Sequence, residues 1–445
     1  MTRLHKLNVP IKKDQVDALR EQFEQLQGNI LKGFGKKNSI FIFLEFKNSE
    51  SFQAQAQQWI RDFAPQITSA QYQIDDKKEG YTDRLCRSFF ISAKGYEYFG
   101  LLNLSNLQKP FKDDEAFCFG MRSAKNKLQD SSPIHWEKGY QKKIHAMILL
   151  TCNNIDELQK EQTNVLSQIG NFSIICLIEH GQVLFKCGKY VEPFGYADSI
   201  SLPIFFEADI PREEDIVWRP GPGVGPSLVL VPDPHGKQDR GKNGLVTKHY
   251  HSGSYIVFRK LQQDVDEFKT RLERYANNVG LSKEAAAARI IGRYQNGTPL
   301  IRSSLRSLQD DLNNFNYDDD PDGDICPLNA HIRKMNPRNN SNIPRIVRRS
   351  IPYNDKEKSE SGGVGLLFTC YQNNITAHFQ RLQKWANKPN YPQHGAGVDS
   401  IISQPEQDSY SKRDQQLTFY DLVTLRGGEY FFAPSIYTLE HFGET

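Results

Sequence analysis

A histidine and a group of arginines stand close together in the segment from 318 to 354. His331 follows an apolar Cys-Pro-Leu approach, and Arg348 and Arg349 lie 17 and 18 positions after it. An imidazole with guanidinium groups one short segment away suits a ligand that carries iron or negative charge. Considered alone, His331 would be interpreted as an interior histidine with satisfied hydrogen bonds. Considered alone, Arg345, Arg348 and Arg349 would be interpreted as a solvated basic turn. A second segment favours a functional site over these structural interpretations. It is EPFGYADSISLP, at 192–203, and it contains Asp198.

Part of the same region imitates a calcium-binding loop. Asp318, Asp320 and Asp322 alternate, as at the start of such a loop. Calcium would need a bidentate glutamate where Asn329 stands, and Pro327 interrupts the exit from the loop. The sequence therefore does not favour a calcium site.

The elements that must position these residues can be predicted from hydrophobic periodicity. Runs of β-branched and aromatic residues predict strands, and apolar residues at intervals of three and four predict helices. In the first half the predicted elements are a helix over 14–27, a strand over 39–46, a helix over 51–64, a strand over 86–93, a helix over 94–104, a strand over 145–152, a helix over 155–170 and a strand with a turn within 172–185.

The second half repeats this order of elements. The predicted elements are a strand over 254–261, a helix over 262–277, a helical insertion over 282–296, a strand over 365–372, a helix over 373–386 and a final hairpin over 419–433. The pair Gly427-Gly428 is the predicted turn of that hairpin.

This repetition predicts an α+β fold made of two similar halves, each an antiparallel sheet backed by helices. A doubly wound parallel sheet fits less well, because strands and helices do not alternate strictly. Residues 211–242, between the halves, are rich in proline, glycine and charge and predict a loop. A chain of 445 residues also exceeds one ordinary hydrophobic core, so two domains are expected.

Composition excludes several classes of partner. The net charge is +3, from 56 basic and 53 acidic residues, so there is no electrostatic case for nucleic acid or an anionic membrane as a partner. The seven cysteines are scattered and form no Cys-x-x-Cys pair, which is typical of reduced, buried thiols. The N-terminus lacks an apolar signal region, and no apolar run reaches transmembrane length. We therefore expect a soluble, cytoplasmic protein.

Several segments, in order along nearly the whole chain, resemble the dye-decolourising (DyP-type) haem peroxidases. They are QGNILKG at 27–33, FGYADSIS at 194–201, GSYIVFRKLQQDV at 253–265, CPLNAHIRKMNPR at 326–338, IVRRSIPY at 346–353, GLLFTCYQ at 365–372 and LRGGEYFFAPS at 425–435. The family's Gly-x-x-Asp-Gly motif ends here in Ser199 instead of glycine. The resemblance implies duplicated ferredoxin-like domains, which we expect at 1–205 and 206–445, with the haem in the C-terminal half.

The resemblance also implies roles for individual residues. His331 matches the proximal histidine that ligates the iron of haem b (iron protoporphyrin IX). Asp198 matches the distal aspartate, and Arg348 matches the distal arginine four residues before Pro352.

Four further residues are expected at the cofactor. Leu366 and Phe368 resemble apolar residues on the distal side, and Asp399 resembles the carboxylate behind the proximal histidine. Arg338 is a candidate partner of a haem propionate, on the ground of its charge.

The function implied is a haem peroxidase that uses hydrogen peroxide to oxidise dyes, phenolic compounds and similar small organic donors. Asp198 would move the proton and Arg348 would stabilise charge as the O–O bond breaks. Because an unperturbed aspartate has a pKa of about 3.9, we expect the fastest oxidation at acidic pH. The alternative is a haem-binding or haem-handling protein with little turnover. A monomer and a homo-oligomer are both compatible with the sequence.

Overall fold

The computed structural model describes residues 3–79, 84–102, 111, 114–186, 188–211, 221–240, 246–302, 313–338, 342–355, 363–391, 393–404 and 419–444. The main elements of the first half follow the order strand, helix, strand, strand, helix, strand. They are β1 (Asn38–Phe46), α2 (Glu50–Phe63), β2 (Cys86–Ser92), β3 (Ala146–Cys152), α7 (Ile155–Ile169) and β4 (Ser173–Gln182).

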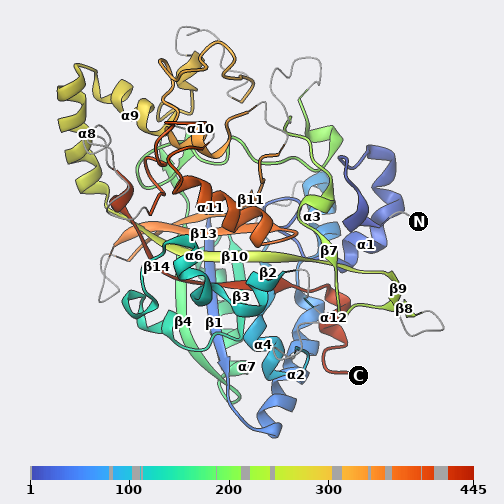
Figure 1. Cartoon of the computed structure of the whole chain (residues 1–445). Helices are drawn as coiled ribbons and strands as arrows, with labels where there is room; N and C mark the ends of the chain where they lie inside the picture. Colours follow the sequence, from blue (N-terminus) through green and yellow to red (C-terminus); the bar gives the residue numbers. More distant parts are fainter. Residues whose placement is uncertain are drawn as a thin grey trace.

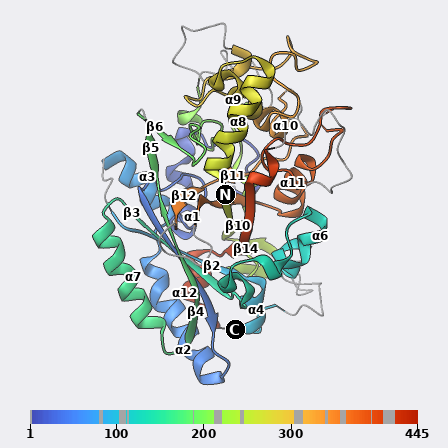
Figure 2. The ribbon, with the colours of Figure 1, turned by 90° about the vertical axis from the view of Figure 1, so that its left-hand side faces the viewer.

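Each of these elements has a local cause. β1 is a run of apolar residues and is buried along almost its whole length. α2 begins where the Ser49 hydroxyl accepts a hydrogen bond from the Phe52 N–H. Its buried residues recur at helical spacing and form one apolar face: Ala56, Trp59, Ile60 and Phe63. This face packs toward the sheet, and α2 and α7 lie side by side (Figures 1 and 2).

The second half repeats the order with insertions. Its main elements are β10 (Ser252–Gln263), α8 (Val265–Val279), β11 (Val347–Arg348), β12 (Ile351–Asn354), β13 (Val364–Gln372), a π-helical turn (Thr376–Gln380), α11 (Arg381–Ala386) and β14 (Val423–Ala433). Between α8 and β11 come α9 (Lys283–Ile291) and α10 (His331–Met335). In Figures 1 and 2, α8, α9 and α10 lie together at the end of the molecule opposite α2 and α7.

All the main strands belong to one antiparallel sheet, in the order β11-β13-β10-β14-β2-β3-β1-β4, with β12 also paired to β13. Within the first half the order is β4-β1-β3-β2, and within the second it is β14-β10-β13-β12. Both orders are those of a ferredoxin-like unit, so the prediction of a duplicated α+β fold is confirmed. The predicted boundary at 205/206 stays a prediction.

The two halves share one core. β14 pairs with β2 at Phe431–Ser92 and Phe432–Ile91, which joins the two four-stranded units. At the other ends of the sheet β4 packs on β12: a Cβ on Gly181 would lie 2.4 Å from the side chain of Ile351. The sheet therefore curls so that its two ends meet.

Side chains of both halves fill the interior of this curled sheet. The ring of Phe258 on β10 lies 5.2 Å from that of Phe41 and 4.8 Å from that of Phe43, both on β1. Lys260, two residues further along β10, also points inward, where its Nζ lies 3.0 Å from Glu179 on β4. β10 therefore has one face toward the shared core.

The predicted hairpin over 419–433 is wrong. Residues 423–433 form one continuous strand, β14, with a register shift opposite Lys260 and Leu261. Gly427 and Gly428 are required there by close approach: a Cβ would lie 2.2 Å from the Tyr140 ring at Gly427 and 2.3 Å from the Phe258 carbonyl at Gly428. A double glycine marks a β-bulge here and not a turn.

Other predicted helices are shorter than expected. The helix over 14–27 consists of 3₁₀ turns followed by α1 (Arg20–Gln25), and that over 94–104 is α4 (Ala93–Tyr98). The remaining helices and strands are short: α3 (Ala70–Glu79), α5 (Glu115–Phe119), α6 (Lys125–Leu128), α12 (Ile436–Glu440), β5 (Leu184–Lys186), β6 (Lys189–Val191), β7 (Val231–Pro232), β8 (Gln238–Arg240) and β9 (Val246–His249). Among the described residues no helix is long and apolar enough to cross a membrane.

Candidate active site

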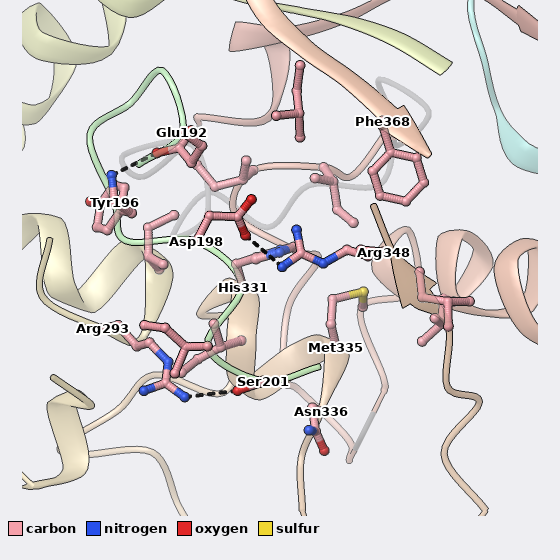
Figure 3. A pocket seen from close by; sticks show the side chains of 18 of the residues that line it. Glu192, Tyr196, Asp198, Ser201, Arg293, His331, Met335, Asn336, Arg348 and Phe368 are labelled. Carbon is pink, nitrogen blue, oxygen red and sulfur yellow. Dashed lines mark hydrogen bonds and ion pairs between the residues drawn. The ribbon is translucent and has the colours of Figure 1, made fainter. Parts of the chain in front are cut away.

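A cavity of about 380 Å³ lies between the sheet and the inserted segments of the second half. Its walls come from β10 and β13, from the loop at 192–203, from α10 and from the segment at 343–348. Figure 3 shows Asp198, His331 and Arg348 among the side chains around this space. The cavity thus brings together Asp198 and Arg348, which are 150 positions apart in the chain.

His331 is oriented by a buried carboxylate. Its Nδ1 lies 2.9 Å from Oδ2 of Asp399, which is fully buried behind the ring. The other oxygen of Asp399 accepts hydrogen bonds from the N–H groups of Ile401 and Ile402, at 2.9 and 2.8 Å. Burial alone would raise the pKa of Asp399, but His331 and these N–H groups lower it below its usual value. An ionised Asp399 leaves Nε2 of His331 as the ring nitrogen available to the cavity.

Asp198 and Arg348 form an ion pair in the cavity wall. Nη2 of Arg348 donates to Oδ1 of Asp198 at 2.9 Å (Figure 3). Burial alone would raise the pKa of Asp198, but the charge of Arg348 and the Ser199 N–H lower it. The charge of Asp198 in turn raises the pKa of Arg348. The pair therefore consists of a carboxylate with a lowered pKa and a permanent cation.

Ser199 occupies the position where the family motif has glycine, and its backbone is left-handed, with φ of +63°. This region is unfavourable for residues that carry a Cβ. The Ser199 N–H donates to Oδ1 of Asp198 at 2.6 Å. The left-handed turn therefore directs a hydrogen-bond donor at the aspartate.

The sheet supplies one wall of the cavity, whose apolar members are Leu261, Leu366 and Phe368. Leu366 and Phe368 on β13 line the cavity, as do Arg259, Leu261 and Gln263 on the neighbouring β10. These residues alternate along their strands because successive side chains point to opposite faces of a sheet. The pairing of Arg259 with Phe368 and of Leu261 with Leu366 sets them side by side.

Arg338 lines the cavity, but its guanidinium is held by the protein. It donates to the carbonyls of Asn313 and Phe315, at 2.7 and 2.5 Å, and lies 3.6 Å from the centre of the Phe315 ring. The residue has a left-handed backbone, with φ of +55°. The guanidinium of Arg338 therefore points at least partly toward the loop at 313–315.

The acidic stretch before α10 makes structural contacts. Asp320 is buried and pairs with Arg333 of α10 at 2.7 Å. Its carboxylate also accepts hydrogen bonds from the N–H groups of Ile325 and Cys326. This cluster fixes the loop that leads into the helix of His331.

Two further cavity residues were given no role in the prediction from sequence. The carboxylate of Glu192 accepts hydrogen bonds from the N–H groups of Phe194 and Tyr196, at 3.0 and 2.9 Å, and Figure 3 shows the one from Tyr196. Arg345 lines the cavity in the segment that also carries Arg348. Glu192 lies six positions before Asp198, and that proximity within one motif is the signal that could have identified it.

The residues present fit the haem that the resemblance implies. A neutral imidazole backed by a carboxylate is a common axial ligand of haem iron. The apolar wall of Leu261, Leu366 and Phe368 suits the flat face of a porphyrin. Among the described residues no cluster of three or more His, Cys, Asp or Glu side chains could hold a separate metal ion. His331 is thus the residue suited to hold the iron.

Comparison with known proteins identifies the family of this chain. Residues 25–179 match the family described as DyP dimeric alpha+beta barrel domain, and residues 233–393 match Dyp-type peroxidase, C-terminal. The multifunctional dye peroxidase DyP2 of Amycolatopsis sp. is 29% identical over 93% of this chain and 94% of its own length.

Solved structures agree with the sequence matches. A DyP-type peroxidase of Anabaena sp. is 31% identical, with a TM-score of 0.83 over 97% of each chain. A dye-decolorizing peroxidase in complex with 2,6-dimethoxyphenol is 26% identical, with a TM-score of 0.74 over 95% of this chain and 99% of that one. The chain therefore belongs to the DyP-type peroxidases and is an oxidoreductase of this haem-dependent family.

Proposed function

We propose that this protein uses hydrogen peroxide to oxidise dyes, phenolic compounds and similar small organic donors in single-electron steps, with haem b held in the described cavity. One observation carries the proposal. A histidine backed by a carboxylate and an aspartate paired with an arginine line the same cavity, although they come from four separate segments.

The haem would supply the redox chemistry, and the chain would supply the proton transfers. The lowered pKa of Asp198 favours its ionised form, which is able to take a proton from one oxygen of hydrogen peroxide and return it to the other. Arg348 keeps its positive charge and would stabilise negative charge on the departing oxygen.

The remaining predicted residues would bind the cofactor. His331 would donate Nε2 to the iron, and Asp399 would hold the ring and increase its basicity. Leu366 and Phe368 would cover the distal side, and Arg338 would lie near a propionate. Arg338 already donates to two carbonyls, so its contribution would be shared with the loop at 313–315.

Similarity to named relatives supports the class of donor. The Amycolatopsis relative is named a dye peroxidase, and a related structure holds 2,6-dimethoxyphenol. Both suggest bulky or phenolic donors for this chain. The assembly state and the cytoplasmic location stay predictions.

The test is the absorption spectrum of the purified, haem-loaded protein before and after peroxide is added. We expect a rapid spectral change in the wild type. Asp198→Asn should slow it by roughly 10²–10⁴-fold, because the proton-transfer group is lost. Arg348→Leu should slow it by roughly 10²–10³-fold, because the stabilising cation is lost.

Asp266→Asn is the matched control, since this aspartate is exposed on α8 with 80% of its side chain accessible. It should react like the wild type. A haem-loaded wild type whose spectrum does not respond to peroxide would instead support the haem-handling alternative, and a protein that takes up no haem would contradict both readings.

A further inference from the structure

Lys334 is a lysine of α10 that lies wholly inside the protein, with 0% of the residue exposed. It follows His331 by three positions, so one short helix carries both residues about one turn apart. A charged group removed from water is costly unless strong hydrogen-bond partners surround it. The partners of Lys334 therefore show what the protein gains from a buried cation at this place.

The ammonium group of Lys334 is held by three backbone carbonyls. Its Nζ donates to the carbonyls of Lys388 and Gly397, each at 2.6 Å, and to that of Tyr391. All three residues lie in the chain between the end of α11 and Asp399. An ammonium group has three N–H donors, so these carbonyls use all of them. Lys334 therefore gathers one segment of the chain around its charge.

The gathered segment is the one that delivers Asp399 to His331. Gly397, whose carbonyl Lys334 holds, stands two positions before Asp399. The N–H of Asp399 donates to the carbonyl of Ala386 at 2.8 Å, and its Oδ2 lies 2.9 Å from Nδ1 of His331. Burial lowers the pKa of Lys334 to about 8, and the charge of Asp399 opposes this change. The cation thus lies close enough to the carboxylate to act on it electrostatically.

Asp399 is held on both sides by the segment that carries His331. Before Asp399 the contact is the ammonium group of Lys334. After it, the N–H and the hydroxyl of Ser400 donate to the carbonyl of Asn329, at 3.3 and 3.0 Å. The contact of Lys334 is the charged one of the two, and hydrogen bonds to charged groups are the stronger kind.

We propose that Lys334 is a positioning residue for the axial histidine. By holding the chain before Asp399, it keeps this carboxylate on Nδ1 of His331 and so makes Nε2 a stronger donor to iron. Hydrogen bonding to an axial ligand is one of the means by which a protein sets the reduction potential of haem iron. The proposal rests on the proposed function, in which His331 holds that iron.

The first arm of the test uses the full-length chain without haem. Hydrogen exchange is followed at the N–H groups of Ile401 and Ile402, which both donate to Asp399. Lys334→Met removes the charge, so these amides should exchange about tenfold faster than in the wild type, the effect of one charge-assisted hydrogen bond. Lys334→Arg retains a cation with several donors and should lie closer to the wild type. Exchange at the wild-type rate in Lys334→Met would overturn the proposal.

The second arm uses the haem-loaded protein and two readouts that a loss of stability alone would not move. They are the reduction potential of the iron and the stretching frequency of the bond between iron and histidine in the reduced protein. In Lys334→Met the potential should rise and the frequency should fall, because His331 donates less strongly. Lys334→Arg should restore both in part. If Lys334→Met does not fold, Lys334→Gln takes its place with the same expectations.

A double substitution shows whether Lys334 acts through Asp399. In the Asp399→Asn background the carboxylate is already lost, so Lys334→Met should shift the potential and the frequency no further. A shift of the same size as in the wild-type background would mean that Lys334 acts by another route, and the proposal would be overturned.

Lys47→Met is the matched control. The ammonium group of Lys47 also donates to backbone carbonyls, those of Gly170 and Asn171 at 3.1 and 2.7 Å, and Lys47 does not line the cavity. It should leave the exchange rates, the potential and the frequency unchanged, and shifts equal to those of Lys334→Met would overturn the proposal. A wild type that binds no haem would instead overturn the proposed function, and the exchange arm would still test the role of Lys334.

Discussion

Asp198 and Arg348 share one hydrogen bond, and that contact sets the pH range in which the aspartate is ionised. Burial raises the pKa of Asp198, while the charge of Arg348 and the N–H of Ser199 lower it, and the net result is a pKa below the ordinary value. The proton-accepting form of Asp198 is therefore present above this lowered pKa and is lost only as the pH falls through it.

Arg348→Leu should move the acid limb of the peroxide reaction to higher pH. Without the arginine, burial is opposed only by the Ser199 N–H, so the pKa of Asp198 should rise. The measurement is the pH dependence of the second-order rate of the spectral change with peroxide. An acid limb at the same pH in the variant and the wild type would show that Asp198 is not the group that titrates.

Ser199 allows a second test that concerns a single residue. Its φ of +63° is tolerated by glycine and is unfavourable for a β-branched residue. Ser199→Gly should therefore react with peroxide within about twofold of the wild type, because the N–H to Asp198 is retained. Ser199→Val should lose about 1–2 kcal/mol of stability, the cost of a left-handed residue, and should react more slowly. Thermal unfolding and the peroxide rate together check this, and equal behaviour of the two variants would contradict it.

At the scale of elements, the loop at 192–198 depends on the carboxylate of Glu192. This carboxylate accepts hydrogen bonds from Phe194, Tyr196 and the Nε2 of Gln263, the last at 2.8 Å. Burial raises the pKa of Glu192, whereas these donors lower it. Because Gln263 lies on β10, the contact attaches the loop of Asp198 to the rigid sheet.

Glu192→Ala should therefore displace Asp198 without touching it. We expect the peroxide rate to fall by roughly 10–100-fold, in line with the loss of a supporting contact at an active site. Glu192→Gln retains one acceptor oxygen, so it should lose less. Haem content and thermal unfolding serve as checks on folding. A peroxide rate in Glu192→Ala equal to that of the wild type would show that the loop is held by other contacts.

At the scale of the whole molecule, Lys260 connects the two halves. Its Nζ lies 3.0 Å from Glu179 on β4, 3.1 Å from Glu137 and 2.8 Å from Asp355, with only 3% of the side chain exposed. Burial alone would lower the pKa of Lys260, but these carboxylates raise it. Burial raises the pKa of Glu179 to about 7, although Lys260 opposes the change.

Lys260→Met should destabilise the protein by about 3–5 kcal/mol, because it leaves buried carboxylates without their cation. The measurement is the free energy of unfolding at neutral pH. Lys269→Met is the control, since Lys269 pairs with Asp266 on the exposed side of α8, and it should change the stability by less than about 1 kcal/mol. Equal effects of the two substitutions would show that Lys260 does not bind the halves together.

Much of the secondary structure of this protein is determined by local sequence and could be predicted from it. The strands β1, β3, β10 and β13 are continuous apolar or alternating runs, and their residue types alone favour extended structure. Caps and glycines set the limits of α2 and α8, at Ser49 and Gly280. A family resemblance predicted only a minority of the residues that line the cavity, and the structure brings these together around it: Asp198, His331, Arg338, Arg348, Leu366 and Phe368.

Tertiary structure decided the rest, because the cause lies in residues distant in the chain. Gly427 and Gly428 look like a turn in sequence, but the close approach of Tyr140 and of β10 makes them a bulge in a continuous strand. The curl that brings β4 to β12 depends on pairing between the halves. Short-range periodicity carries no information on such contacts between distant residues.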